Sequence, residues 1–267
     1  MSHSKAQIIA TIGPTSAKKE ILLAMARAGM DIIRFNFSWA DIPTRLTQLS
    51  LVREVEKEIG RNIPIIADLP GPRVQKGRAH TYDSGINTCI TEEDKVFVKF
   101  AIEQKIEWIA LSFVASAENV VCARDIIREY GGDQKIIAKI ERKVALDNLD
   151  SIITVSDAVM VARGDLGAEI PLEEIPFAER LIIEKCKKAG KPVITATEML
   201  LSMTEHDTPT RAELTDVTQA ILMGSDAVML SEETATGKYP VEAVTMMEKL
   251  VTESEKHMVG TLDIHPL

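Results

Sequence analysis

Eight short apolar runs, each followed by a longer amphipathic stretch, restrict the fold of this 267-residue chain more than any other feature. Several runs are rich in Val and Ile and almost continuously hydrophobic, which is typical of parallel strands buried on both faces. Eight strand–helix units in about 250 residues is the count of a (β/α)8 TIM barrel. The predicted strands are Gln7–Ile12, Asp31–Phe35, Ile63–Asp68, Trp108–Phe113, Lys135–Ile140, Ala158–Ala162, Val193–Ala196 and Ala227–Leu230.

The stretches between these runs carry helix start and stop signals. Thr91 and Thr210 each stand three residues before an acidic side chain, the pattern of a capping box. A doubly wound open sheet is the competing fold, but it would more often show a glycine-rich loop after its first strand. We therefore predict an α/β fold, a (β/α)8 barrel that forms a single domain over residues 1–267. The predicted helices are Ala17–Ala28, Thr44–Ile59, Glu93–Glu103, Ala117–Glu129, Leu172–Ala189, Ala212–Met223 and Val241–Glu255, with a shorter one after Lys143.

Composition argues against several functional classes. The net charge is -9, and the absence of a long basic block disfavours a nucleic-acid-binding protein. No apolar run approaches the roughly 20 residues of a membrane helix, and the first residues show no apolar signal region, so we expect a cytoplasmic protein with no membrane partner. Cys89, Cys122 and Cys186 are widely spaced, which predicts reduced thiols and no disulfide framework.

One predicted connection is unusually long. The segment Leu69–Ile90 has little periodicity, whereas loops between a strand and the next helix usually have about 2–6 residues. Long loops of this kind often serve a functional site.

Polar residues gather at the predicted carboxyl ends of the strands, where barrel enzymes build their active sites. Side chains two residues apart on a strand point the same way, so Lys139 and Glu141 should share one side. Lys139 interrupts an apolar run, and a buried lysine needs a partner or a function; the alternative is a Lys–Glu pair that only closes the barrel. The polar residues at these ends are Arg34, Asn36, Ser38, Asp68, Ser112, Lys139, Glu141, Arg163, Asp165, Thr195, Thr197, Ser231 and Glu233.

Glu141 and Asp165 end consecutive predicted strands, which lie about 4.8 Å apart in a parallel sheet. Two carboxylates there could converge on one Mg²⁺ ion, although Asp165 could equally begin an ordinary turn. Arg34 and Lys139 supply positive charge opposite them. Together these groups predict a site for an anionic substrate that carries a phosphate or a carboxylate.

Long segments of the chain resemble the catalytic barrel of the pyruvate kinase family, in the same order along the sequence. The similar segments are Ile8–Ser16, Gly29–Ser38, Ala138–Glu141, Met160–Gly167, Gly190–Leu200, Pro209–Glu213 and Asp226–Ala235.

The resemblance implies a role for each matching residue. Glu141 and Asp165 match the ligands of Mg²⁺ or Mn²⁺, and Lys139 matches the catalytic lysine that neutralises the transferring phosphoryl group. The other implied roles are phosphate contact for Arg34, proximity to the enolate methylene carbon for Thr197, substrate binding through the Arg163–Asp165 segment with its Gly164 backbone, and K⁺ binding for Asn36, Ser38 and Asp68.

The chain also departs from the family pattern. The usual Asp-Thr-Lys-Gly-Pro-Glu-Ile-Arg motif reads Asp68-Leu-Pro-Gly-Pro-Arg-Val-Gln75 here, and Trp39 stands where a histidine is usual near the nucleotide. We expect a short loop over residues 69–91 to stand where the family inserts a lid domain, and we expect no counterpart of the family's C-terminal domain in this chain. Because lid closure completes a phosphoryl-transfer site, its loss should weaken the use of ADP more than enolate chemistry.

Three functions remain open on this basis. The first is a pyruvate kinase-like enzyme that transfers phosphate from phosphoenolpyruvate to ADP, with Mg²⁺ and K⁺. The second is a metal-dependent pyruvate-enolate lyase, an aldolase or oxaloacetate-type decarboxylase, which acts on pyruvate or a related 2-oxo acid and needs no ADP or ATP. The third is a non-catalytic binding barrel, which the costly set of buried charges disfavours. The resemblance further implies a homo-oligomer that associates through barrel helices.

Overall fold

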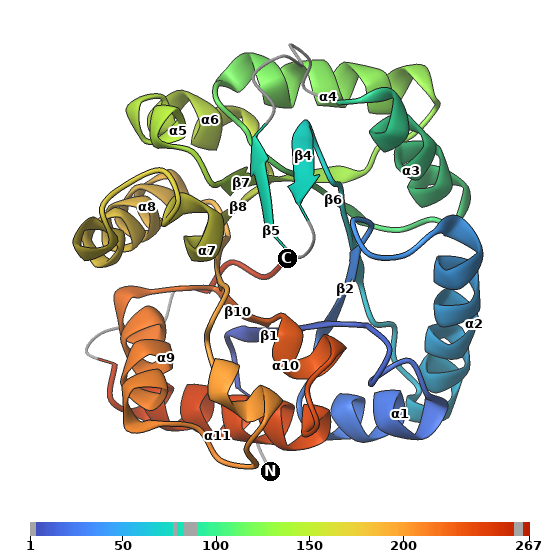
Figure 1. Ribbon diagram of the computed structural model, residues 1–267, viewed down its shortest axis with the longest axis vertical. Coiled ribbons are helices and arrows are strands. Elements are labelled where there is room, and N and C mark those ends of the chain that lie inside the picture. The colour runs from blue at the N-terminus through green and yellow to red at the C-terminus, as the bar shows by residue number, and fades with distance from the viewer. Residues whose placement is uncertain (1–3, 77–78, 83–89, 259–263) are drawn as a thin grey trace.

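The computed structural model describes residues 4–76, 79–82, 90–258 and 264–267, and its core is a closed barrel of eight parallel strands (Figure 1). The strands neighbour one another in the order β1-β10-β9-β8-β7-β6-β3-β2, which confirms the predicted fold. They are β1 (Gln7–Thr11), β2 (Ile32–Asn36), β3 (Ile65–Asp68), β6 (Trp108–Leu111), β7 (Lys135–Ile140), β8 (Ala158–Ala162), β9 (Val193–Ala196) and β10 (Ala227–Leu230).

Helices surround the barrel, as the amphipathic stretches predict. They are α1 (Lys19–Ala28), α2 (Ile42–Ile59), α3 (Glu92–Glu103), α4 (Ala117–Glu129), α5 (Lys143–Asp147), α6 (Leu149–Val155), α7 (Arg163–Leu166), α8 (Ile175–Ala189), α9 (Arg211–Met223), α10 (Glu232–Ala235) and α11 (Pro240–Lys256), with 3-10 turns at Leu172–Glu174 and Leu201–Thr204. Both predicted capping boxes form: the Thr91 hydroxyl accepts the Asp94 N–H at 3.0 Å, and Thr210 and Glu213 repeat the exchange.

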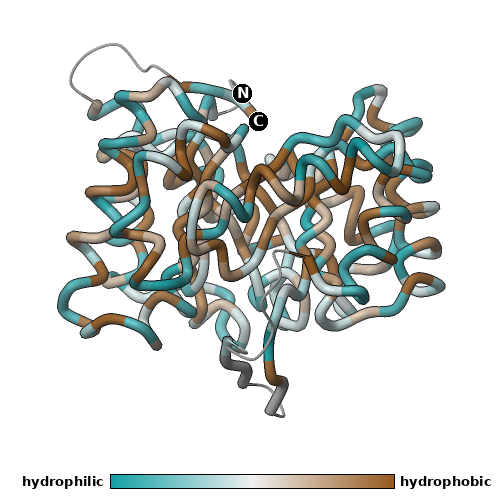
Figure 2. The backbone as a smooth tube through the Cα atoms, turned by 90° about the horizontal axis from the view of Figure 1, so that it is seen from above, coloured by the Kyte–Doolittle hydropathy of each residue, from teal (hydrophilic) through white to brown (hydrophobic). Residues whose placement is uncertain are grey.

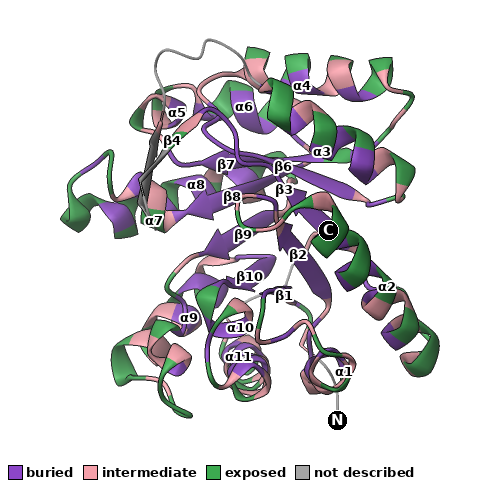
Figure 3. Ribbon diagram, turned by 45° about the vertical axis from the view of Figure 1, so that its right-hand side comes forward, coloured by how far each residue is buried: buried purple, intermediate pink, exposed green. Residues whose placement is uncertain are grey.

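The apolar strands are buried on both faces, as the coloured ribbon shows (Figure 3). Outward side chains pack against the helices, whereas inward ones fill the barrel interior. The interior set includes Ile9, Ile66 and Met160, and Leu267 packs against it. This double burial explains why the strands read as continuous hydrophobic runs instead of alternating ones.

The long connection after β3 contains two strands that the sequence did not predict. β4 (Arg73–Lys76) and β5 (Ala79–Tyr82) pair antiparallel, with Arg73 opposite Tyr82. Figure 2 shows this pair projecting from the end of the barrel opposite the two chain termini. Because β3 leads directly into it, the hairpin stands at the carboxyl end of the barrel strands, beside the candidate site.

The cysteines differ from expectation at one position. Cys186 is free and buried in α8, and burial together with the charge of Asp226 raises the pKa of its thiol to about 12. Cys122 is disulfide-bonded, so the expectation of a reduced thiol is wrong there. Cys89 lies outside the described residues. Among the described helices, none has the length and apolar character needed to cross a lipid bilayer.

Candidate active site

Asp68 is the centre of a buried charge cluster at the carboxyl end of the barrel. One of its oxygens accepts from Arg34 Nε at 2.7 Å, and the other accepts from Lys139 Nζ at 3.0 Å. The Asp68 side chain is only 1% exposed. Burial would raise the pKa of Asp68, but the charges of Lys139 and Arg34 outweigh it and hold that pKa below its usual value.

Lys139 connects Asp68 to Glu141. Its ammonium lies 2.8 Å from Glu141 Oε1 and donates to Ser112 Oγ at 2.8 Å. This contact confirms that Lys139 and Glu141, two residues apart at the carboxyl end of β7, share one side. Burial lowers the pKa of Lys139, but the nearby carboxylates more than compensate and raise it to about 12. The lysine therefore stays charged at neutral pH.

The carboxylate of Glu141 is held by Lys139 through one oxygen and by a backbone N–H through the other. Its Oε2 accepts the backbone N–H of Phe113 at 2.6 Å. Phe113 has a positive φ of 58°. Burial raises the pKa of Glu141, Lys139 opposes that shift, and the charge of Asp165 adds to it. The charge of Asp165, which lies in α7 after β8, therefore acts on Glu141.

Arg73 also reaches this cluster, and sequence reasoning missed it. Burial lowers the pKa of the half-buried Arg73 guanidinium, while the charges of Asp68, Asp165 and Glu141 oppose that shift. The hairpin therefore brings a cation to the carboxylates. Its replacement of the usual glutamate in the third-strand motif was the available signal.

Thr197 and Gly164 meet at the neighbouring strand ends. The Gly164 N–H donates to Thr197 Oγ1 at 2.8 Å, and Thr197 Oγ1 donates to the Ala196 carbonyl at 2.6 Å. Thr197 has a φ of 72°, which is unusual for a β-branched residue and suggests that its surroundings hold it in place.

The side chain of Arg163 holds the backbone at Thr197 in place through hydrogen bonds to its carbonyl and to that of Ala196. Its guanidinium donates to the Thr197 carbonyl at 2.7 Å and pairs with Asp216 at 2.7 Å and Glu179 at 3.3 Å. Arg163 therefore joins the start of α7 to α8 and α9. These bonds occupy its side chain, so any contribution of this residue to substrate binding falls to its backbone.

We expect Arg163→Gln to lower the free energy of unfolding by about 3–5 kcal/mol, because it leaves the Glu179 carboxylate buried without its cation. Urea titration measures the loss. Arg180→Gln, which breaks an exposed pair with Glu184 on the same helix, should cost under about 0.5 kcal/mol. Equal losses of unfolding free energy in the two variants would show that the ion pairs of Arg163 do not stabilise the fold.

Two of the three residues predicted to hold K⁺, Asn36 and Asp68, are partners in the register of β2 and β3. Asn36 Oδ1 accepts the Ser38 N–H at 3.0 Å, and Ser38 lies in the turn after β2. Both oxygens of Asp68 already face cations. The Leu69 carbonyl, which follows Asp68, accepts from Ser112 Oγ at 2.7 Å.

A cavity of about 630 Å³ opens beside Arg34 at the ends of β1, β2 and β10. Arg45 lines it and is only 2% exposed. Its guanidinium donates to the carbonyls of Ile12 and Asn36 and to the Gln48 side chain. Burial, and then the charge of Arg34, lowers the pKa of Arg45 to about 10. Trp39, 57% exposed, lines the same cavity.

The carboxylates suit a divalent cation that is completed by its substrate. Within the described residues, no group of three or more His, Cys, Asp or Glu side chains is placed to bind a metal alone. Mg²⁺ commonly takes one or two protein carboxylates and fills its other positions with water and substrate oxygens. The mutual repulsion of Glu141 and Asp165 is the feature that a cation between them would relieve.

Comparison with known proteins identifies the family. Residues 3–89 and 86–244 match a family model described as pyruvate kinase, barrel domain. A pyruvate kinase of Thermococcus litoralis is 36% identical over 336 aligned positions, which cover 96% of this chain and 70% of that protein. The chain belongs to the pyruvate kinase family. A pyruvate kinase of Agrobacterium vitis is 35% identical with the same coverage, and one of Geobacillus stearothermophilus is 34% identical, covering 94% of this chain and 57% of that protein.

The alignments also show what the relatives have in addition. The 336 aligned positions exceed the 267 residues of this chain, so the Thermococcus protein contains positions that have no counterpart here. The two stretches matched by the family model overlap at residues 86–89, inside the long connection after β3.

Proposed function

We propose that this chain catalyses Mg²⁺-dependent transfer of the phosphoryl group of phosphoenolpyruvate to ADP through enolpyruvate. The observation that carries the proposal is the position of the Lys139 ammonium, 3.0 Å from Asp68 and 2.8 Å from Glu141 at the carboxyl end of the barrel. Membership of the pyruvate kinase family supports it.

The proposed reaction uses the charges of the cluster in turn. The bond between the enol oxygen and phosphorus breaks, and a terminal oxygen of ADP forms a new bond to that phosphorus. Arg34 and Lys139 face the phosphate and offset the negative charge that spreads over its oxygens. A divalent cation held by Glu141 and Asp165 would supply Lewis-acid stabilisation of the substrate oxygens.

The remaining residues position the three-carbon unit. Backbone groups of the Arg163–Asp165 segment, at the start of α7, are proposed to bind the substrate carboxylate. Thr197 is proposed to lie beside the methylene carbon, which takes up one proton from solvent as the enolate left by phosphoryl transfer becomes pyruvate. The hydrogen bond from the Gly164 N–H to Thr197 Oγ1 fixes that hydroxyl next to the backbone proposed to bind the substrate carboxylate.

We propose that ADP binds in the cavity beside Arg34. Its wall contains the buried Arg45 cation, and no ion pair joins Arg45 to an acidic group in the described part of the chain. A buried cation without a carboxylate partner favours an anionic ligand. Trp39 offers an aromatic face at the same cavity for a nucleobase.

Binding of ADP should therefore quench the fluorescence of Trp39. The chain has two tryptophans, and the other, Trp108, is 3% exposed inside the barrel. A titration of the wild type with ADP should show saturable quenching, whereas Trp39→Phe should show none. Quenching that persists in Trp39→Phe would show that the nucleobase of ADP does not bind against Trp39.

We further propose that the hairpin of β4 and β5 stands where relatives carry a lid domain. The division of the family match into two stretches that overlap at residues 86–89, shortly after β5, supports that placement. A two-stranded hairpin covers less of the site than a domain, so ADP should bind more weakly than phosphoenolpyruvate. This would leave enolate chemistry less affected than phosphoryl transfer.

The cations around Asp68 support activity without K⁺. Arg34 and Lys139 neutralise Asp68, and Arg73 adds positive charge to the same region. With Mg²⁺ present, replacing K⁺ by tetramethylammonium should change kcat by less than about twofold, equivalent to about 0.4 kcal/mol. Strong activation by K⁺ would show that Asp68 or Asn36 rearranges to bind it.

An assay panel with Mg²⁺ tests the proposal. Formation of ATP from phosphoenolpyruvate and ADP is the expected result. The second candidate, a pyruvate-enolate lyase, is favoured by the replacement of nucleotide-side residues such as the family histidine at Trp39. Absence of ATP formation together with loss of oxaloacetate, or with exchange of pyruvate methyl protons, would replace the first proposal by the second. Self-association and a cytoplasmic location stay predictions.

A further inference from the structure

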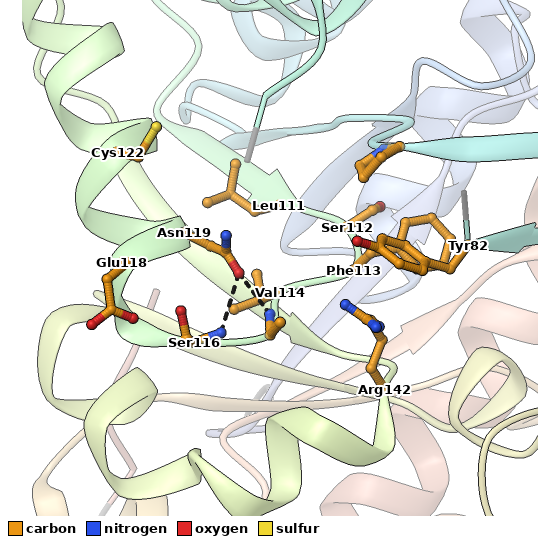
Figure 4. A pocket seen from close by; sticks show the side chains of 12 residues that line it. Tyr82, Leu111, Ser112, Phe113, Val114, Ser116, Glu118, Asn119, Cys122 and Arg142 are labelled. Atoms are coloured by element: carbon orange, nitrogen blue, oxygen red, sulfur yellow. Dashed lines mark hydrogen bonds between the residues drawn. The ribbon is translucent and has the colours of Figure 1, made fainter. Parts of the chain in front are cut away.

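A second cavity, of about 460 Å³, lies between the hairpin and the connection from β6 to α4 (Figure 4). Tyr82 of β5 and Phe113 contribute aromatic faces, and Arg142 contributes a cation. Its volume falls in the usual range for small-molecule sites, about 300–1,000 Å³. The proposed reaction uses none of these three side chains.

Arg142 is the feature of this cavity that most needs explanation. Its guanidinium carbon lies 3.7 Å from the centroid of the Tyr82 ring, and the rings of Tyr82 and Phe113 are 5.7 Å apart. In the described residues, the Arg142 side chain has no hydrogen bond or ion pair, and its Nε is shielded from water without an acceptor. A partly desolvated cation costs free energy unless an anion meets it.

The other polar groups of the cavity are already engaged. Asn119 Oδ1 accepts the N–H groups of Ala115 at 2.8 Å and Ser116 at 3.1 Å, so the start of α4 is capped. Glu118 is exposed, and a hydrogen bond from Ser116 holds its pKa below the usual value, which leaves a negative charge at the rim. Arg142 is therefore the group that remains available to hold an anion.

We propose that this cavity binds a small organic anion whose carboxylate or phosphate pairs with Arg142 and whose body lies against Tyr82 and Phe113. The same Phe113 donates its N–H to Glu141, so the cavity wall is continuous with the candidate active site. The proposal is a statement about binding and does not depend on the proposed phosphoryl transfer.

Isothermal titration calorimetry of the full chain tests it with two probes, inorganic phosphate and succinate. Arg142→Gln should weaken binding of at least one probe by about tenfold or more, which corresponds to about 1.4 kcal/mol. Arg128→Gln is the matched control, because that arginine lies on α4 with its side chain 69% exposed. Anion binding at the Arg34 cluster should be the same in all three proteins, so the difference reports on Arg142.

A second variant keeps the test valid if Arg142→Gln disturbs the hairpin. Ala115 lines the cavity, and Ala115→Glu would place a carboxylate where it competes for Arg142 without removing it. This variant should lose the same binding event, and circular dichroism checks its fold. Phosphate-only binding would identify a phosphate ligand, and succinate binding a carboxylate. Wild-type affinity for both probes in both variants, or no binding of either probe to the wild type, would overturn the proposal.

Discussion

Lys139→Met is expected to lower kcat for ATP formation by about 10³-fold or more, equivalent to about 4 kcal/mol of lost transition-state stabilisation. The reason is that methionine keeps the length of the side chain but removes the ammonium that pairs with both Asp68 and Glu141. The variant should still fold, because Asp68 keeps Arg34 and Glu141 keeps the Phe113 N–H. A coupled assay of ATP formation measures the effect.

Lys135→Met provides the matched control for this experiment. Lys135 begins the same strand, β7, but is exposed at its other end, so its loss should leave kcat close to the wild-type value. Urea titration should show Lys139→Met destabilised by about 3–5 kcal/mol, the cost of breaking a buried pair. Undiminished ATP formation by folded Lys139→Met would remove the lysine from the reaction.

Glu141→Gln is expected to weaken the binding of Mn²⁺ by at least about tenfold, or about 1.4 kcal/mol. Glutamine keeps the shape and can still accept the Phe113 N–H, but it removes one of the two carboxylates proposed to hold the cation. Asp165→Asn should have a similar effect. Electron paramagnetic resonance of free Mn²⁺ measures affinity without any reaction.

Glu169→Gln is a suitable comparison for these variants. Glu169 is exposed beyond α7, where its carboxylate accepts the Lys143 N–H at 3.3 Å. Its replacement should leave Mn²⁺ binding unchanged. If Glu141→Gln binds Mn²⁺ as tightly as the wild type, the ion is held elsewhere and the assignment of this carboxylate is wrong.

Much of the fold could be predicted from the sequence, because strands buried on both faces leave an unmistakable pattern. The Val/Ile-rich runs located all eight barrel strands, and the threonine capping boxes located the starts of α3 and α9. The contact between Lys139 and Glu141 followed from the two-residue period of a strand. These features depend on local chemistry, which a single sequence displays directly.

Features that depend on distant partners could not be predicted in this way. Nothing local to Arg163 indicates that it pairs with Glu179 and Asp216, which lie 16 and 53 residues away. The pairing of β4 with β5 and the approach of Arg73 to the carboxylates depend on how an irregular segment folds back over the barrel. The disulfide at Cys122 was missed for the same reason, since spacing alone gave no sign of it.

The most direct test is a crystal structure of the chain grown with Mn²⁺ and oxalate, a planar dianion that resembles the enolate of pyruvate. The account predicts one strong anomalous peak for Mn²⁺ between the carboxylates of Glu141 and Asp165, with oxalate bound to it and the Lys139 ammonium within hydrogen-bond distance. A Mn²⁺ peak away from both carboxylates, with oxalate bound elsewhere, would contradict it.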